Sequence, residues 1–319
     1  MKKNEQNYLL HFGLFLVTLI TTMFAGTEWT TGRMPPYEFS EMVARGLPYS
    51  LAVLFIISVH EFGHYFAARY HKVNSTLPFY IPFPPVPGFL NFGTMGAVIK
   101  TRDPMNDNIK IFDIGVAGPV AGFVATVAVL IYGFTHLPGV EYILSIHPDY
   151  FSPDYGKNGI GLIFGNSLLY SLLQHLFTTP GEFVPPMSEM YHYPFLMAGW
   201  FGLLITSMNL MPVGQLDGGH VIYGMFGSRV QEKVASVFMA FLITSGFLGV
   251  VESYFDVADA YGWAGWLFWA GVLYFAIKVK HPPVYLRFEL DLKRKIIGWF
   301  AIIIFILSFI PVPFTIVIP

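Results

Sequence analysis

The chain contains no cysteine, and only 12% of its 319 residues are charged. Without cysteine it can form neither a disulfide nor a thiolate metal site, and it has no thiol nucleophile. Any metal ion must therefore be bound by His, Asp or Glu. A soluble domain usually carries about twice this fraction of charged residues, so the shortage of charge argues against a soluble globular protein.

The chain also lacks an excess of positive charge, since 18 Lys and Arg residues face 20 Asp and Glu residues. A nucleic-acid-binding protein normally presents a basic surface, so we expect no nucleic-acid partner. What the chain has instead is apolar sequence, with 54% hydrophobic residues and a mean hydropathy of +0.56. This composition excludes a disordered chain and favours a membrane protein.

Seven apolar runs approach the roughly 20 residues that a transmembrane helix needs. They cover residues 8–25, 47–70, 111–135, 193–213, 234–251, 262–279 and 296–312. A shorter amphipathic run at 160–177 is expected to dip into the membrane or to lie on it. The first run could also be a signal peptide, but we favour a retained span because no convincing cleavage site follows it. The sequence predicts an all-α polytopic membrane protein with about six to seven transmembrane helices, in which residues 1–319 form one membrane-embedded unit.

The basic residues predict the direction of these spans. With the N-terminus in the cytosol, every Lys and Arg lies on the cytosolic side except Arg33, Arg45 and Lys157. The positive-inside rule describes this asymmetry. It also places the ends of the second and fourth runs on the cytosolic side. We expect a bacterial inner membrane, with an organellar membrane as the alternative.

Three ionisable residues lie within five positions of the second run, in the sequence HEFGH. His60 and His64 are four residues apart, so on a helix they share one face about one turn apart. Both imidazoles can then bind one metal ion, while Glu61 between them can act as a general base. Ionisable residues inside a span are costly and normally functional, which favours a metal site over a chance pattern.

A hydrolytic zinc site usually has three protein ligands and a water, so two histidines leave it incomplete. The fourth run ends in MNLMPVGQLDGGH, where Asp217 is the one carboxylate and is expected at the same depth as the histidines. The Pro and Gly residues around it interrupt the helix, and such backbone is tolerated in a membrane only when it is buried or lines a wet cavity. A simple turn is the alternative. His220 is a competing ligand, a second-shell partner or the start of the next helix. The other histidines have no ligand-like spacing and are expected to be interfacial or packed: His11, His71, His136, His147, His175, His192 and His281.

The HEFGH sequence together with the downstream string resembles the site-2 protease family of intramembrane zinc metalloproteases. The matching positions of the string are Asn209, Pro212, Gly214, Leu216, Asp217, Gly218 and Gly219. The resemblance covers most of residues 47–312 and is strongest to the bacterial and chloroplast branch that lacks a PDZ domain.

This resemblance implies a three-helix catalytic core, at about residues 47–225, with accessory spans at 8–25, 262–279 and 296–312. It implies that His60, His64 and Asp217 bind Zn²⁺ and that Glu61 activates the water. Asn209 would orient the substrate or contact the oxyanion. The implied partners are a transmembrane protein substrate and the lipid bilayer. No feature of the sequence indicates an oligomeric state.

Two further segments bear on such a site. Residues 78–100 are rich in Pro and then Gly, which excludes a lipid-exposed span and predicts a re-entrant loop or a short β-hairpin on the cytosolic side. Its edge could pair with an unwound substrate, or it could be a packed surface loop. In the third run, Gly118 and Gly122 form a small-x-x-x-small pair that is typical of close helix packing.

Two other functions remain as alternatives. A membrane protease that cuts at the surface, of the CaaX type, also carries HExxH, but its third ligand is usually a Glu. A proteolytically silent binding protein or transporter would use zinc structurally, in a closed site that needs no base. The presence of Glu61 favours the intramembrane endopeptidase over the silent protein.

Overall fold

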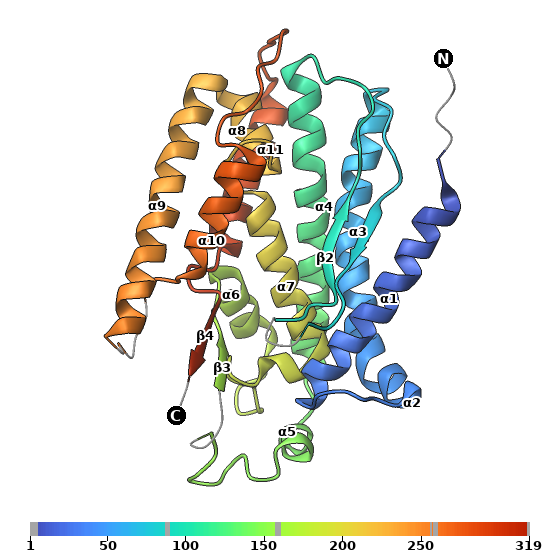
Figure 1. Cartoon of the computed structure of the whole chain (residues 1–319), viewed down its shortest axis with the longest axis vertical. Coiled ribbons are helices and arrows are strands. Elements are labelled where there is room, and N and C mark those ends of the chain that lie inside the picture. Colours follow the sequence, from blue (N-terminus) through green and yellow to red (C-terminus); the bar gives the residue numbers. More distant parts are fainter. Residues whose placement is uncertain (1–5, 87–89, 157–160, 256, 258–260, 318–319) are drawn as a thin grey trace.

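A computed structural model describes residues 6–86, 90–156, 161–255, 257 and 261–317. The described chain is a long bundle of helices with two small antiparallel sheets (Figure 1). The helices are α1 (Tyr8–Thr31), α2 (Phe39–Glu41), η1 (Met42–Gly46), α3 (Leu47–Tyr70), α4 (Asn108–Thr135), α5 (Val140–Ile146), α6 (Leu168–Phe177), η2 (Met190–His192), α7 (Pro194–Asn209), α8 (Asp217–Phe226), α9 (Ser228–Tyr254), α10 (Gly265–Val272), η3 (Leu273–Ile277) and α11 (Leu292–Ser308). The strands are β1 (Phe79–Pro82), β2 (Thr94–Val98), β3 (Gly161–Phe164) and β4 (Phe314–Val317). The predicted all-α membrane fold is confirmed.

Four helical segments are long and apolar enough to cross a membrane: Tyr8–Thr31, Phe39–Tyr70, Asn108–Thr135 and Ser228–Tyr254. The other three predicted spans form shorter helices. Of these, α7 has 16 residues and α11 has 17 residues, while α10 and η3 together cover Gly265–Ile277. The protein is a multi-pass membrane protein, and its number of passes stays a prediction.

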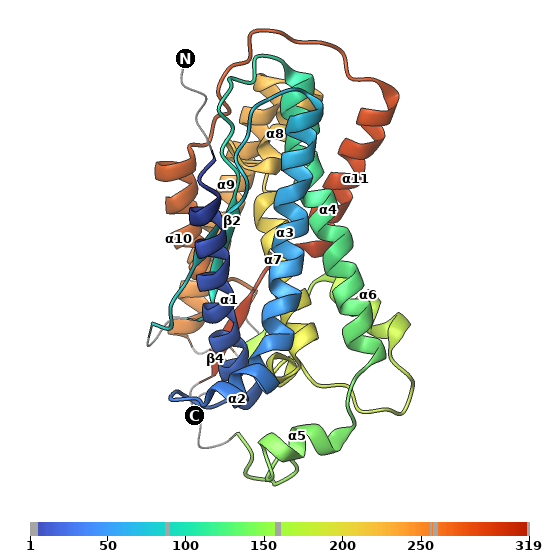
Figure 2. The ribbon, with the colours of Figure 1, turned by 90° about the vertical axis from the view of Figure 1, so that its right-hand side faces the viewer.

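The long segments alternate in direction along the bundle (Figures 1 and 2). Helices α1, α4 and α9 run one way, while α3 and α7 run the other way. Helix α4 is central, since it packs against α3, α7 and α8. This arrangement brings the end of α3 and the start of α8 to the same half of the molecule, as the alternation of basic residues predicted.

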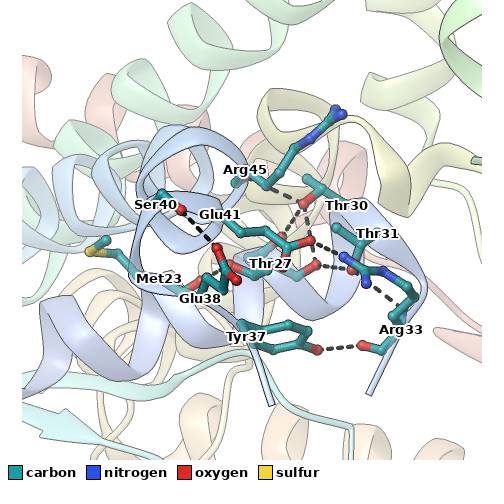
Figure 3. A network of polar contacts seen from close by, with 11 residues as sticks. Met23, Thr27, Thr30, Thr31, Arg33, Tyr37, Glu38, Ser40, Glu41 and Arg45 are labelled. Atoms are coloured by element: carbon teal, nitrogen blue, oxygen red, sulfur yellow. Dashed lines mark hydrogen bonds and ion pairs between the residues drawn. The ribbon is translucent and has the colours of Figure 1, made fainter. Parts of the chain in front are cut away.

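The corner after α1 holds that helix tightly against the next one. Gly26 and Gly46 face each other, and a Cβ on Gly26 would lie only 2.7 Å from the Gly46 carbonyl oxygen. Figure 3 shows the polar contacts beyond this crossing, where Arg33 forms an ion pair with Glu41 and Thr30 donates a hydrogen bond to the Arg45 carbonyl. Close packing and these polar contacts fix α1 beside η1 and α3.

Residues 78–100 contain the predicted β-hairpin. Strands β1 and β2 are antiparallel, with Phe79 opposite Val98 and Pro82 opposite Thr94. Residues 87–89, which lie between the two strands in the sequence, are outside the described residues. Helix α1 holds the hairpin through side chains, since the Trp29 indole donates to the Asn91 carbonyl at 2.7 Å. The hairpin is therefore a fixed part of the bundle.

The prediction of one amphipathic run at 160–177 is wrong in its first part. Residues Gly161–Phe164 form β3, which pairs with β4 so that Gly161 lies opposite Val317. The helix begins only at Leu168, where Ser167 caps it by accepting a hydrogen bond from the Tyr170 amide. The strand partner comes from the other end of the chain, and a local apolar pattern carries no information about such a partner.

Candidate metal centre

His60 and His64 lie in the second half of α3, and both are buried, with 4% and 8% of their surface exposed. Their Nε2 atoms are 3.1 Å apart. The i, i+4 spacing on a regular helix produces this pairing. The two imidazoles therefore point at one place inside the bundle.

Asp217 comes to the same place from α8, of which it is the first residue. Its Oδ2 atom lies 3.4 Å from His60 Nε2 and 3.3 Å from His64 Nε2. Gly214 has a φ of +54°, which allows the chain to turn sharply before α8. The carboxylate is thus part of a built site, with its side chain 17% exposed, rather than of an exposed turn.

The three side chains fit a tetrahedral zinc ion. Ligand atoms about 2.1 Å from such an ion lie about 3.4 Å from one another, and the three observed separations are 3.1, 3.3 and 3.4 Å. His64 Nδ1 lies 2.7 Å from the Ile114 carbonyl oxygen. A proton on Nδ1 satisfies this contact and leaves the Nε2 lone pair free for a metal, as outer hydrogen bonds do in zinc sites.

Helix α4 makes room for these imidazoles through its glycines. A Cβ on Gly118 would overlap the His64 ring, and a Cβ on Gly122 would lie 2.9 Å from His60 Cβ. The sequence predicted this pair as a packing motif. The sequence did not identify the partner of this pair, which is the face of α3 that carries His60 and His64.

His220 lies one turn further along α8 and outside the group formed by His60, His64 and Asp217. Its Nδ1 lies 2.8 Å from His281 Nε2, and its Cβ packs against Gly115 of α4. This position fits the expectation that His220 belongs to the helix after Asp217.

Glu61 and Asn209 both line a cavity of about 470 Å³ that His60 also lines. Glu61 is buried, with 6% of its surface exposed. Asn209 is the last residue of α7, and its Nδ2 lies 3.3 Å from His60 Nε2. The predicted base and the predicted amide therefore meet at the same cavity.

The rest of the cavity is mostly apolar. Strand β2 lines one side with Thr94–Val98, and Leu273 and Ile277 of η3 line another. Strand β2 pairs with β1 on one edge, and in the described part of the chain no other strand pairs with it. The site thus combines a polar cluster, an apolar wall and an open strand.

Comparisons with known proteins agree with this chemistry. The family model described as Peptidase family M50 matches residues 48–249. The chain is similar to "Probable zinc metalloprotease EGY1, chloroplastic" of Arabidopsis thaliana, at 29% identity over 70% of this chain and 40% of the relative. The protein of the same name from Oryza sativa subsp. japonica is 30% identical, over 69% and 38% of the two chains. "Probable zinc metalloprotease EGY2, chloroplastic" of Oryza sativa subsp. indica is 26% identical, over 70% and 36%. The chain therefore spans about two fifths of the length of these relatives. No solved structure matches it.

Proposed function

Because the chain belongs to peptidase family M50, we propose that it is a zinc-dependent endopeptidase that hydrolyses peptide bonds in or near the transmembrane segments of membrane proteins. His60, His64 and Asp217 would hold the zinc ion. The single observation that carries the proposal is the position of Glu61, which lines the same cavity as His60 at one turn or less from both histidines. A purely structural zinc site needs no such carboxylate.

The reaction needs a Lewis acid, a base and a proton donor. When bound, zinc polarises a carbonyl and lowers the pKa of a water. Glu61 takes the proton from the attacking water and then delivers it to the nitrogen of the leaving amine. Asn209 is placed beside His60, where its amide can donate a hydrogen bond to the substrate carbonyl as negative charge develops on it.

The cavity favours an extended and apolar substrate. Its wall contains Ile56, Phe92 and Phe201, which suit the side chains of a transmembrane segment. A helical substrate must unwind before hydrolysis, because its carbonyls are occupied in helix hydrogen bonds. The open edge of β2 can pair with the unwound segment. This pairing would hold the scissile bond beside Glu61.

We further propose residues 47–225 as the catalytic core and 1–319 as one membrane-embedded unit. The N-terminus would be cytosolic, in a bacterial inner membrane, with the site near the cytosolic side. The absence of cysteine makes this orientation directly measurable. Single-cysteine variants at the exposed positions Lys293 and Ser152 should react with an impermeant thiol reagent from the cytosolic and the outer side respectively. The opposite pattern would reverse the topology.

Cleavage-site mapping tests the substrate class. The purified full chain would be reconstituted into liposomes with a set of labelled single-span membrane proteins, and the products would be sequenced by mass spectrometry. We expect cuts within or next to the apolar segment of the substrate. Cuts confined to the soluble tails would favour a surface protease instead, and the absence of cuts in any substrate, from protein that holds zinc, would favour the silent binding protein.

A further inference from the structure

A second group of two histidines and a carboxylate lies at the other end of the bundle, beside α5 (Figure 2). His147 directly follows α5, Glu189 directly precedes η2, and His192 is the last residue of η2. The Nε2 atoms of the two histidines are 3.0 Å apart. Glu189 Oε2 lies 3.8 Å from His147 Nε2 and 3.6 Å from His192 Nε2.

The carboxylate of this group is buried and incompletely paired. Glu189 is 4% exposed. Its Oε1 accepts a hydrogen bond from the Tyr155 hydroxyl at 3.0 Å, but its Oε2 has no hydrogen-bond partner among the described residues. A buried oxygen without a partner destabilises the fold, and does so more strongly when it is charged. Such an atom in a native structure calls for a cation or another ligand.

Neither of the two imidazoles forms a hydrogen bond to the unpaired Glu189 Oε2. The separations of 3.6 and 3.8 Å from Glu189 to the imidazoles exceed the length of a hydrogen bond. The three donor atoms surround one point, as ligand atoms spaced by about 3.4 Å around a tetrahedral ion do.

We propose that His147, Glu189 and His192 form a second metal site, which binds a divalent transition-metal ion of the zinc class. Two imidazoles and one carboxylate are a common ligand set for zinc. The ion would join α5 to η2, and through η2 to α1, where Gly32 lies against the His192 ring. The site is independent of the proposed peptidase activity, because none of its residues lines the catalytic cavity.

Metal content in a background without the first site tests this proposal. The full chain carrying His60→Ala and His64→Ala would be purified in detergent, supplied with zinc, desalted and subjected to elemental analysis. We expect about one zinc ion per chain to remain. Adding Glu189→Gln should remove it, whereas His136→Ala, an exposed histidine near the same end, should not. Retention of the ion in the Glu189→Gln variant would overturn the proposal.

Cobalt binding provides a second readout that does not depend on the background variant folding. Titration of the otherwise unmodified chain with Co²⁺, followed by visible absorption, should saturate about one equivalent earlier in Glu189→Gln than in the wild type. As a folding control, the Glu189→Gln protein must elute at the same size as the wild type and unfold in a single transition. If it does not, His147→Ala is used in its place, because His147 is only half-buried and its substitution disturbs the fold less. Equal saturation in wild type and variant would overturn the second site. The outcome does not depend on whether the protein cleaves any substrate.

Discussion

The two histidine–carboxylate groups of this protein have nearly the same donor atoms but different surroundings. In the first, His60, His64 and Asp217 come from the ordered helices α3 and α8, and their contacts span 3.1–3.4 Å. In the second, His147 and Glu189 come from the connections around α5 and η2, and the contacts span 3.0–3.8 Å. A similar group of side chains is thus held once by two long-range helix contacts and once between short segments.

The two groups also differ in the side chains and the cavity that lie beside them, and this difference determines what chemistry each could support. The first group borders a cavity of about 470 Å³ that Glu61 also lines. The second group has instead a tyrosine hydroxyl on its carboxylate, and none of its three residues lines the cavity beside the first group. Ligands alone therefore favour metal binding, whereas ligands with an adjacent base and an open cavity favour hydrolysis.

The largest expected effect comes from removing a ligand of the first group. Asp217→Asn keeps the shape of the side chain but removes its charge. Since even the loss of an outer hydrogen bond costs about 10–100-fold in metal affinity, we expect a loss of more than about 100-fold here, and cleavage should fall with zinc content. Elemental analysis and a cleavage assay check both. The matched change Glu189→Gln should leave zinc in the first group and leave cleavage unchanged, and an equal loss of cleavage in both variants would contradict the difference between the two groups.

A smaller effect is expected from the helix that packs against the first group. Gly118→Ala places a Cβ where the His64 ring lies, so the imidazole must shift. We expect zinc affinity and cleavage to fall by about 10–100-fold, the cost typical of disturbing the support of a ligand. Gly13→Ala is the control, because a Cβ on that helical glycine meets nothing within 4 Å. An unaffected Gly118→Ala protein would mean that α4 does not position the histidines.

The smallest effect concerns the support of the second group. Tyr155→Phe removes only the hydroxyl that donates to Glu189 Oε1. The Glu189 carboxylate then loses the hydrogen bond that orients it. We expect the proposed second site to bind zinc about 10-fold more weakly. The zinc affinity is measured by competition with a chromophoric zinc chelator, in protein that also carries His60→Ala and His64→Ala. An unchanged affinity would show that Glu189 is held by other contacts.

The contrast between the sites also explains what the sequence could predict. His60 and His64 are four residues apart on one helix, so their pairing follows from helix geometry alone. Asp217 is distant in sequence, but the Pro and Gly residues around it mark an irregular segment at the same depth, and the resemblance to a known family supplied its role.

The second group escaped prediction because it depends on the folding of a long connection. His147 and His192 were expected to be interfacial or packed, and His192 is buried. Their approach to Glu189 was not predicted. The spacing of Glu189 and His192 by three residues was the one local signal, because it places Glu189 at the N-cap of η2 and His192 at its end, about one turn apart. His147 comes close only through the turn between α4 and α5. The pairing of β3 with β4 was missed for the same reason.

The most direct test of the central claim is to measure zinc content and cleavage together in Glu61→Gln. This substitution preserves the size of the side chain and leaves His60, His64 and Asp217 intact, but it removes the base. We predict wild-type zinc content and a cleavage rate lower by about 10²–10⁴-fold, the contribution typical of a general base. Glu182→Gln, an exposed acidic residue, is the control. Wild-type cleavage by Glu61→Gln at full zinc content would contradict the assignment of Glu61 as the base.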